Sequence, residues 1–500
     1  MPANSVDDAF SASRARFEQV CGFMGDKEAA GLTHGELEAR LSVDVRDLVR
    51  QLYQDHLDLR SAREERFGDV TDAAGCGRGY VEAGHVRPLR TIFGEVDVTR
   101  LAYRHRGKDN LYPADAVLNL PAELHSHGLR ELCAVESSRG SFEEASKALC
   151  RATGMTLGKR QVEQLAARAA VDFEAFYTDP SRTPAAVSHI DVLVLSADGK
   201  GIVMRPDALR PATAKAAGKA TAKLKTRLSK GEKGNRKRMA EVGAVYDATP
   251  IMRAPTDIIG HAHDTARPPA PKATNKWLTA SVVDNAATVI SKVFDEAQRR
   301  DPAHQRSWVA LVDGANHQID RIKAEAKARH VQVTIVCDFI HVLEYLWSSA
   351  WSFFNEGDPA AEAWVAHKAL AVLNGHASTV AASIRRKATC HGLDPNTRAN
   401  ADRCANYLLA KRDYLNYPHA LEHGWPIATG VIEGACRHLV KDRLDLTGAR
   451  WGLNGAEAIL KLRALRTNGD FDEYWKFHLD NGRHRVHETR YANATLPMAA

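Results

Sequence analysis

Three carboxylates in this 500-residue chain stand where side chains can hold a hard metal ion. Asp198 follows the apolar run 192–195, and Asp313 follows the apolar run 309–312. Each is followed at once by a glycine, which predicts a strand that ends on an acidic residue. If the two strands are neighbours, their C-terminal ends meet at one edge of a sheet, where the ligand sites of open sheets lie. Glu433, early on a late helix, could lean over the same edge.

Three gathered carboxylates repel one another unless protons or cations neutralise them. Oxygen ligands suit Mg²⁺, which also binds substrate phosphates. Two such ions about 4 Å apart stabilise the attacking and leaving oxygens of an in-line phosphoryl displacement. Asp198, Asp313 and Glu433 therefore predict a two-Mg²⁺ centre. Arg437 and Lys441 follow Glu433 at helical spacing and could support it, although an ordinary surface ion pair explains the spacing equally well.

A block of cations between Arg205 and Arg238 predicts a polyanionic partner. Such a block repels itself, so it is either a solvated loop or a surface that contacts a phosphate backbone. We favour the phosphate contact, because clustered Lys and Arg release counterions from nucleic acid. Its cations include Lys223, Lys225, Arg227, Lys230, Lys233, Arg236, Lys237 and Arg238.

The segment that precedes the first core strand reads as two helices joined by a short turn at Gly154. Ser141 and Glu144 form a capping-box pattern at the start of the first helix. Lys159, Arg160 and Gln161 begin the second, where a helix-turn-helix meets base edges or phosphates. A helix hairpin that never touches DNA remains the alternative.

The remainder predicts a mixed α/β sheet with a helical insertion. Asp198 is expected to end its strand, and "GIVMR" to pair back on it. The string "WLTASVVDNAATVISKVFDEAQRR" is expected to be a helix, and everything from Trp347 to about Leu421 to be helical. Near the N-terminus, residues 34–65 carry apolar side chains at helical spacing. They are expected to pack on their own chain, with self-association as the alternative.

Composition excludes several classes of protein. No window approaches eighteen uninterrupted apolar residues, so a membrane span is not expected. The N-terminus "MPANSVDDAF" lacks the basic and apolar regions of a signal peptide. The eight cysteines contain no C-x-x-C pair, which argues against a disulfide framework and fits a reducing cytoplasm.

Taken in order, these features resemble the DDE transposases of bacterial insertion sequences, in particular the ISKra-type group of the Mutator-like assembly. The resemblance runs from about Arg87 to Leu465 and is carried by the two strand-borne aspartates and by three strings. These strings are "DFIHVLEYLW", "GVIEGACRHLVKDRLDLTGARW" and "RWGLNGAEAILKLRAL". It implies a ribonuclease H-like fold, two Mg²⁺ ions (with Mn²⁺ as a substitute) and a catalytic triad of Asp198, Asp313 and Glu433.

The resemblance leaves the second aspartate open. Asp338 and His341 match a C/D-x-x-H signature that follows the second catalytic aspartate in the family, which makes Asp313 catalytic and these two residues supporting. The order of elements agrees, because the second aspartate ends the strand after the first crossover helix. Asp338 remains the alternative.

The sequence thus predicts a transposase that binds the terminal inverted repeats of its element and target DNA, in a homodimer or larger synaptic complex, in the bacterial cytoplasm at the nucleoid. A structure-specific nuclease of the same fold and a non-catalytic DNA-binding regulator are the alternatives. The predicted regions are 1–66 (helical), 67–125 (β-rich), 126–180 (helix-turn-helix-like), 181–346 (first part of the core), 347–425 (helical insertion), 426–480 (last part of the core) and 481–500 (tail).

Overall fold

The computed structural model describes residues 9–182, 191–219, 224, 226–227, 229, 236–260, 267–446 and 448–497. The chain divides into two compact units, residues 1–178 with 469–500 (unit 1) and residues 179–468 (unit 2). Residues 469–480, expected to close the core, belong to unit 1. Within the described ranges, no helix is long and apolar enough to cross a bilayer.

Unit 1 is built around a long helical hairpin, a two-stranded ribbon and a small helical group. The strands β1 and β2, in the region predicted to be β-rich, pair antiparallel through a turn at Gly94. Helix α4 packs on α2 and on β2. The elements are α2 (Ser11–Met24), α3 (Lys27–Ala30), α4 (His34–Ala62), β1 (Tyr80–Thr91), β2 (Gly94–Arg104), α5 (Pro113–Val117), α6 (His127–Arg139), α7 (Phe142–Thr153), α8 (Lys159–Ala169), α9 (Phe173–Thr178), α22 (Phe471–Val486), η4 (Glu488–Arg490) and η5 (Ala492–Ala494).

The predicted pair of helices forms as expected in unit 1. Ser141 accepts a hydrogen bond from the amide of Glu144, whose side chain accepts one from the amide of Ser141. Gly154 ends α7 in the left-handed conformation, φ 72°, which suits a residue without a Cβ. The core that α6, α7 and α8 share contains Leu129, Cys133, Ala145, Leu149, Leu157, Val162 and Leu165.

Unit 2 is a mixed α/β unit with a five-stranded sheet in the order β5-β4-β3-β6-β7. Strands β3, β4 and β5 pair antiparallel, whereas β3, β6 and β7 pair parallel. The strands are β3 (Val192–Val203), β4 (Lys237–Ala248), β5 (Ala273–Ser281), β6 (Trp308–Val312) and β7 (Val333–Cys337).

Helices of unit 2 lie on both faces of this sheet. A Cβ added to Gly243 of β4 would meet Val293 and Val289 of α12, so that face belongs to α12. The opposite face carries α19 (Gly430–Ala435) and the π-helical segment η3 (Cys436–Lys441), whose Cys436 reaches Asp198. Helix α21 (Leu453–Asn468) packs against the edge strand β5. In chain order, the first helices of unit 2 are η1 (Pro206–Ala208), α10 (Pro211–Gly218), α11 (Pro255–Ile258), α12 (Ala286–Arg300), α13 (Asn316–Ala328) and α14 (Phe339–Ala350).

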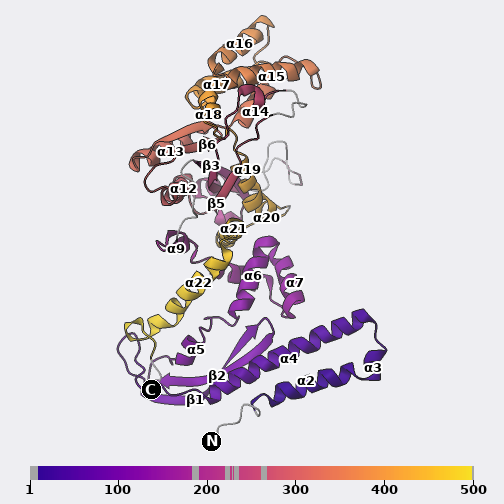
Figure 1. Cartoon of the computed structure of the whole chain (residues 1–500), viewed down its shortest axis with the longest axis vertical. Helices are drawn as coiled ribbons and strands as arrows, with labels where there is room; N and C mark the ends of the chain where they lie inside the picture. Colours follow the sequence, from indigo (N-terminus) through magenta and orange to yellow (C-terminus); the bar gives the residue numbers. More distant parts are fainter. Residues whose placement is uncertain are drawn as a thin grey trace. The chain divides into compact units, whose positions relative to one another are not determined.

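The predicted helical insertion is present and gathers at one end of unit 2 (Figure 1). The chain then returns to the sheet through α19. The remaining helices are α15 (Pro359–Leu373), α16 (Ala377–Cys390), α17 (Ala399–Ala410), η2 (Arg412–Tyr414), α18 (Tyr417–Glu422), α19 (Gly430–Ala435), η3 (Cys436–Lys441), α20 (Asp442–Leu444) and α21 (Leu453–Asn468).

Two local predictions for this unit were wrong. Residues 277–281, expected to be helical, belong to β5, because the apolar run there is buried in the sheet beside β4 and the helix α12 begins only at Ala286. Asp198 does not end its strand. The strand β3 continues to Val203 as a ribbon with β4, so "GIVMR" extends β3 instead of pairing back on it.

Candidate carboxylate site at the sheet edge

Asp198, Asp313 and Asp338 fall in one row across three strands. The parallel pairing of β3 with β6 has Ser196 opposite Leu311 as its last pair, so Asp198 and Asp313 are the residues two further on. The pairing of β6 with β7 ends with Val312 opposite Cys337, and Asp313 and Asp338 come next. Neighbouring strands lie about 4.8 Å apart. The sheet therefore brings Asp198 beside Asp313 even though β3 itself runs on.

Asp198 points to the face of the sheet that α19 and η3 cover. Asp198 pairs with Val242, and the next residue of β4, Gly243, faces α12. Because successive residues of a strand face opposite sides, Val242 and Asp198 face away from α12. The buried Cys436 thiol donates to Asp198 Oδ2 at 3.4 Å. The amide of Gly199 donates to Asp198 Oδ1 at 2.6 Å. Asp198 remains partly exposed.

Glu433 reaches the same place from α19. Burial is the largest cause that raises the pKa of the Cys436 thiol, and the negative charges of Asp198 and Glu433 raise it further. Both carboxylates therefore act on one thiol. Glu433 is exposed, and its Oε1 accepts a hydrogen bond from Thr429 Oγ1 at 3.2 Å. Thr429, buried at 6% exposure, lies at the N-terminal cap position of α19.

Asp313 keeps a partly exposed side chain at the end of β6. Its Oδ1 accepts the amide of Ala315 at 2.8 Å, and its carbonyl oxygen accepts the hydroxyl of Tyr407 at 3.1 Å. Gly314 follows at φ 98°, and a Cβ there would meet the Tyr407 hydroxyl at 3.0 Å. Tyr407 belongs to α17, so the helical insertion fixes the backbone at this strand end.

Asp338 has a different environment. It is 3% exposed and caps α14, accepting the amide of Ile340 at 3.0 Å. Its Oδ2 accepts Thr429 Oγ1 at 2.8 Å, and its Oδ1 accepts the Thr429 amide at 3.3 Å. Both oxygens are thus committed to holding α14 and α19 against β7. His341 lies next to this network: its ring pairs with Glu344 at 3.1 Å and packs on Tyr407 with 5.9 Å between ring centroids.

Arg437 and Lys441 do not form the predicted helical row with Glu433. The helix passes at Cys436 into the π-helical segment η3, whose hydrogen bonds span five residues, so the i,i+4 spacing no longer stacks these side chains. Both are exposed, and Arg437 Nε lies 3.8 Å from Asp442 Oδ1. Cys436 faces the sheet in their place.

The predicted DNA-binding residues divide into three groups. On α8, Lys159, Arg160 and Gln161 are all exposed; Lys159 pairs with Glu143 at 2.6 Å, and Gln161 accepts the amide of Gly158 at 3.0 Å. Lys223, Lys225, Lys230 and Lys233 lie outside the described residues, whereas Arg227 is described and exposed and Arg236 immediately precedes β4.

The two cations that open β4 have partners within unit 2. Lys237 pairs with Asp445 at 3.0 Å. Arg238 donates to the carbonyls of Val282 at 2.7 Å and Ala208 at 3.2 Å. The guanidinium group of Arg238 therefore has a structural role within unit 2, and its contact with DNA stays a prediction.

A cleft of about 560 Å³ adjoins the Glu433 helix. Its walls include Gly430 and Gly434 of α19, and its cationic groups are Arg253 and Lys276. Among the residues that line it there is no Asp or Glu. Its charge therefore favours an anionic occupant.

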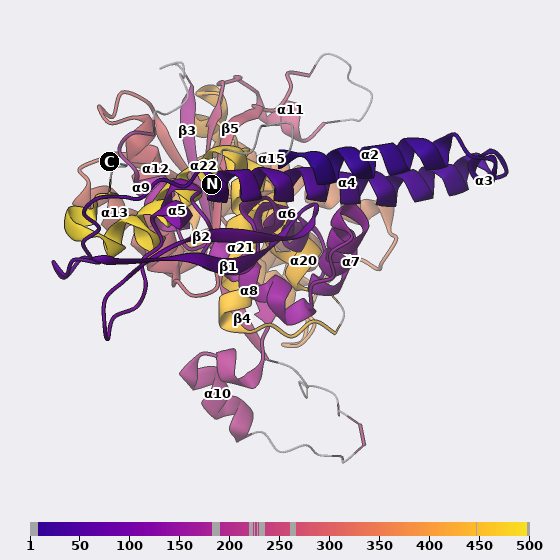
Figure 2. The same ribbon diagram turned by 90° about the horizontal axis from the view of Figure 1, so that it is seen from below.

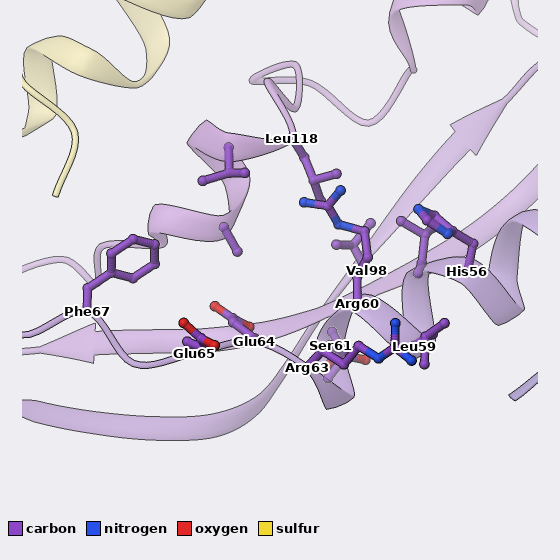
Figure 3. Close-up of a pocket in the computed structure, with 14 residues that line it drawn as sticks. His56, Leu59, Arg60, Ser61, Arg63, Glu64, Glu65, Phe67, Val98 and Leu118 are labelled. Atoms are coloured by element: carbon purple, nitrogen blue, oxygen red, sulfur yellow. The ribbon is translucent and has the colours of Figure 1, made fainter. Parts of the chain in front are cut away.

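A second cavity, in unit 1, is unrelated to the carboxylates. Figure 3 shows it between the end of α4 and the strand β2, with His56, Glu64, Phe67 and Leu118 around it. Its volume is about 380 Å³. Burial, as the largest cause, raises the pKa of Glu64, whose Oε2 accepts the amide of Leu101 at 2.9 Å.

Sequence reasoning missed Thr429, Cys436, Tyr407 and Glu241. Thr429 could have been found as a capping residue before a helix, and Cys436 by its position one turn after Glu433. Glu241 of β4 stands opposite Gly199, and burial raises the pKa of its carboxyl, with Asp198 adding to the effect. No sequence signal marks Tyr407.

The carboxylates suit Mg²⁺ by donor type, since all offer hard oxygen ligands. Within the ranges that the structure describes, no group of three or more His, Cys, Asp or Glu side chains is drawn together closely enough to hold a metal ion. The donors that the strand register brings to neighbouring positions are Asp198 and Asp313, and Glu433 acts on the same Cys436 thiol as Asp198.

Comparisons with known proteins add little to this geometry. No protein-family model and no curated protein matches the chain. A solved structure, the Drosophila P element transposase strand transfer complex, is similar over 73% of this chain and 82% of that chain, at 10% sequence identity and a TM-score of 0.24. A TM-score of that size carries no argument about this chain.

Proposed function

We propose that this protein is a metal-dependent DNA transposase of the DDE type, with a ribonuclease H-like core in unit 2. The strand order β5-β4-β3-β6-β7, antiparallel on one side of β3 and parallel on the other, is compatible with that core. The single observation that carries the proposal is the row of carboxylates two residues beyond the β3–β6 pairing, with a helix bearing Glu433 over it.

Asp198 and Asp313 would hold Mg²⁺, with Glu433 as the third carboxylate. Bound there, Mg²⁺ would stabilise the negative charge that develops on the phosphate oxygens during displacement. The catalytic second aspartate in this proposal is Asp313, because its carboxylate is partly exposed, while both oxygens of the buried Asp338 already accept hydrogen bonds. Asp338 is then a positioning residue.

The chain's own residues would place these groups. The neutral thiol of Cys436 donates to one oxygen of Asp198 and the amide of Gly199 donates to the other, so each oxygen keeps a second lone pair for a ligand. Thr429 can donate to Asp338 or Glu433 and so links the strand end to the helix. The cationic cleft beside α19 would bind the phosphodiester backbone, which predicts binding that weakens steeply with salt.

The test is a cleavage assay on labelled duplex DNA that carries a terminal inverted repeat of the element, with Mg²⁺ present. We expect the full chain to cut at the repeat and to join the 3′ end to target DNA. Asp198→Asn, Asp313→Asn and Glu433→Gln should each lower cutting by at least a hundredfold while DNA binding persists, since they remove metal ligands and not the cations. Asp295→Asn, which changes an exposed carboxylate of the same unit, should cut normally.

The rival functions give different products. Cutting without strand transfer indicates a nuclease of the same fold. Binding without cutting by the unaltered chain indicates a regulator. Full activity in Asp313→Asn together with a folded, inactive Asp338→Asn would move the second aspartate to Asp338.

A further inference from the structure

The helical hairpin formed by α2 and α4 has an unusual distribution of buried residues. Of the 29 residues of α4 only Asp55 and Leu57 are buried, and of the 14 residues of α2 only Ser13 is. Helices of a soluble domain normally bury an apolar stripe. The two helices run side by side at the edge of unit 1, joined by α3 (Figure 2).

The contact between the two helices is largely polar. Ser13 Oγ donates to Asp55 Oδ2 at 2.6 Å, and Arg16 pairs with Asp47 at 2.6 Å. Arg40 lies over the ring of Phe23 at 4.6 Å. The face of α2 that meets α4 therefore carries residues 13, 16, 20 and 23, and the exposed Phe17, Cys21 and Met24 lie on another face.

Those apolar residues form a stripe on each helix. On α2, Phe17 is 57% and Met24 42% exposed, and the exposed Cys21 lies between them. On α4, Val45 is 40% and Leu52 42% exposed. The partly exposed Leu41 and Leu48 complete the second stripe at spacings of four, three and four residues, which is the spacing of a coiled-coil seam.

Both stripes lie on the same side of the hairpin. Each residue of a helix is rotated by 100° about the helix axis from the one before it. On both helices, the stripe is rotated by about 90° about the axis from the face that meets the other helix, in the sense in which the residue number increases. Because the helices run antiparallel, these two rotations bring the stripes to one side. The residues of α4 that meet β2, among them Gln54 and Leu57, lie on a different side. The two stripes thus make one continuous surface, the hairpin face: Phe17, Cys21, Met24, Leu41, Val45, Leu48 and Leu52.

We propose that the hairpin face docks on the same face of a second copy of this chain, making an antiparallel four-helix bundle. The face spans about 17 Å along α4 and about 20 Å across two helices, on the order of 300 Å². The largest contiguous apolar patch of a soluble protein is typically about 300–600 Å² and is often a functional surface.

Charge favours a copy over DNA as the occupant. None of the seven residues of the hairpin face is charged, and the neighbouring helix positions carry both signs, with Arg14, Glu18 and Glu38. A nucleic acid requires a surface rich in cations. An interface between two copies requires a surface complementary to itself, which an apolar centre with a rim of mixed charge satisfies.

The test measures mass by analytical ultracentrifugation of the full chain across the micromolar range. We expect twice the chain mass of 54.9 kDa. Phe17→Glu and Val45→Glu should each raise the dissociation constant about a hundredfold, since each places an unpaired charge in the centre of the contact. The matched control is Val86→Glu, an equally exposed valine of β1 in the same unit, at 58% exposure, which should leave the mass doubled.

A second measurement follows the native thiol. Cys21 should react with a maleimide more slowly in the unaltered chain than in Phe17→Glu, as read by peptide mass. A chain that sediments at a single copy's mass at every concentration would falsify the proposal. Equal effects of all three substitutions, control included, would also overturn it. The proposal does not depend on catalysis: Asp198→Asn should keep the doubled mass, so its failure and that of the proposed function are distinguishable.

Discussion

Two aspartates on neighbouring strand ends, Asp313 and Asp338, differ in what their oxygens already do. Asp338 accepts hydrogen bonds from Ile340 and Thr429 in a buried setting, whereas Asp313 accepts the single amide of Ala315 and stays partly exposed. A buried carboxylate whose oxygens both accept hydrogen bonds is typical of a structural role. A partly exposed carboxylate with one oxygen left for a partner suits ligand binding. This difference makes the two positions separable by experiment.

We expect Asp338→Ala to lower the free energy of unfolding of unit 2 by about 2–4 kcal/mol. The substitution removes a helix cap and the acceptor of the buried Thr429 amide. Asp313→Ala should change stability by less than about 1 kcal/mol, because its side chain makes one local bond. Urea unfolding followed by circular dichroism measures both. Equal destabilisation by the two changes would contradict the distinction.

His127 gives unit 1 a dependence on pH. Its Nε2 donates to the carbonyl of Asn119 at 2.6 Å, and Arg130 donates to its Nδ1 at 2.9 Å. Burial lowers the pKa of His127 from 6.5 to about 4, and Arg130 adds to this effect. The folded state therefore holds the neutral ring, while the unfolded chain takes up a proton below pH 6.5.

Because the folded pKa is depressed, the stability that His127 contributes is present above about pH 6.5 and is lost as the pH falls towards 4. The shift corresponds to about 3 kcal/mol. We expect His127→Gln to flatten the loss of stability of unit 1 across this window, as measured by thermal unfolding at stepped pH. The exposed His105, changed to Gln, should leave the slope unaltered.

At the scale of elements, the strand β4 approaches α12 at Gly243. A Cβ at this position would lie 2.5 Å from Val293 Cγ2 and 3.2 Å from Val289 Cγ1. The glycine therefore sets how closely the sheet and the helix pack. Since α12 contacts both β3 and β4, this packing also fixes the strand that carries Asp198.

Gly243→Ala should destabilise unit 2 by about 1–3 kcal/mol, because the added methyl overpacks a closed contact. The control is Gly434→Ala on α19, where nothing lies within 4 Å of the added atom. That change should be neutral or slightly stabilising, because alanine favours helix. Thermal unfolding compares the two variants, and an unchanged midpoint for Gly243→Ala would disprove the close packing.

At the scale of the whole molecule, the chain forms two compact units. Unit 1 has its own core, in which Leu149 is fully buried, and unit 2 is organised around its sheet. Chains of several domains commonly unfold in more than one step.

Calorimetry of the full chain should therefore show two transitions. Leu149→Ala, which opens a cavity in the core of unit 1, should cost about 3 kcal/mol and lower one transition. Gly243→Ala should lower the other. A single transition that both substitutions lower equally would show that the units unfold together.

The sequence by itself determined the local elements. Periodicity and capping predicted α4 and the α7–α8 pair, because these depend on contacts between residues close in the chain. The strands that carry Asp198 and Asp313 were also predicted, since buried apolar runs followed by an acidic residue and glycine are local signals. The extent of β3 and the start of β5 were not, because both depend on pairing with β4.

Only the tertiary structure decided which side chains meet. The register of β3 with β6 places Asp198 beside Asp313 across more than a hundred residues of sequence, and no local pattern encodes a register. The π-helical segment brings Cys436 to Asp198 in place of Arg437, and Tyr407 reaches Asp313 from the helical insertion. Such contacts arise from packing between distant segments, which residue types and spacing do not fix.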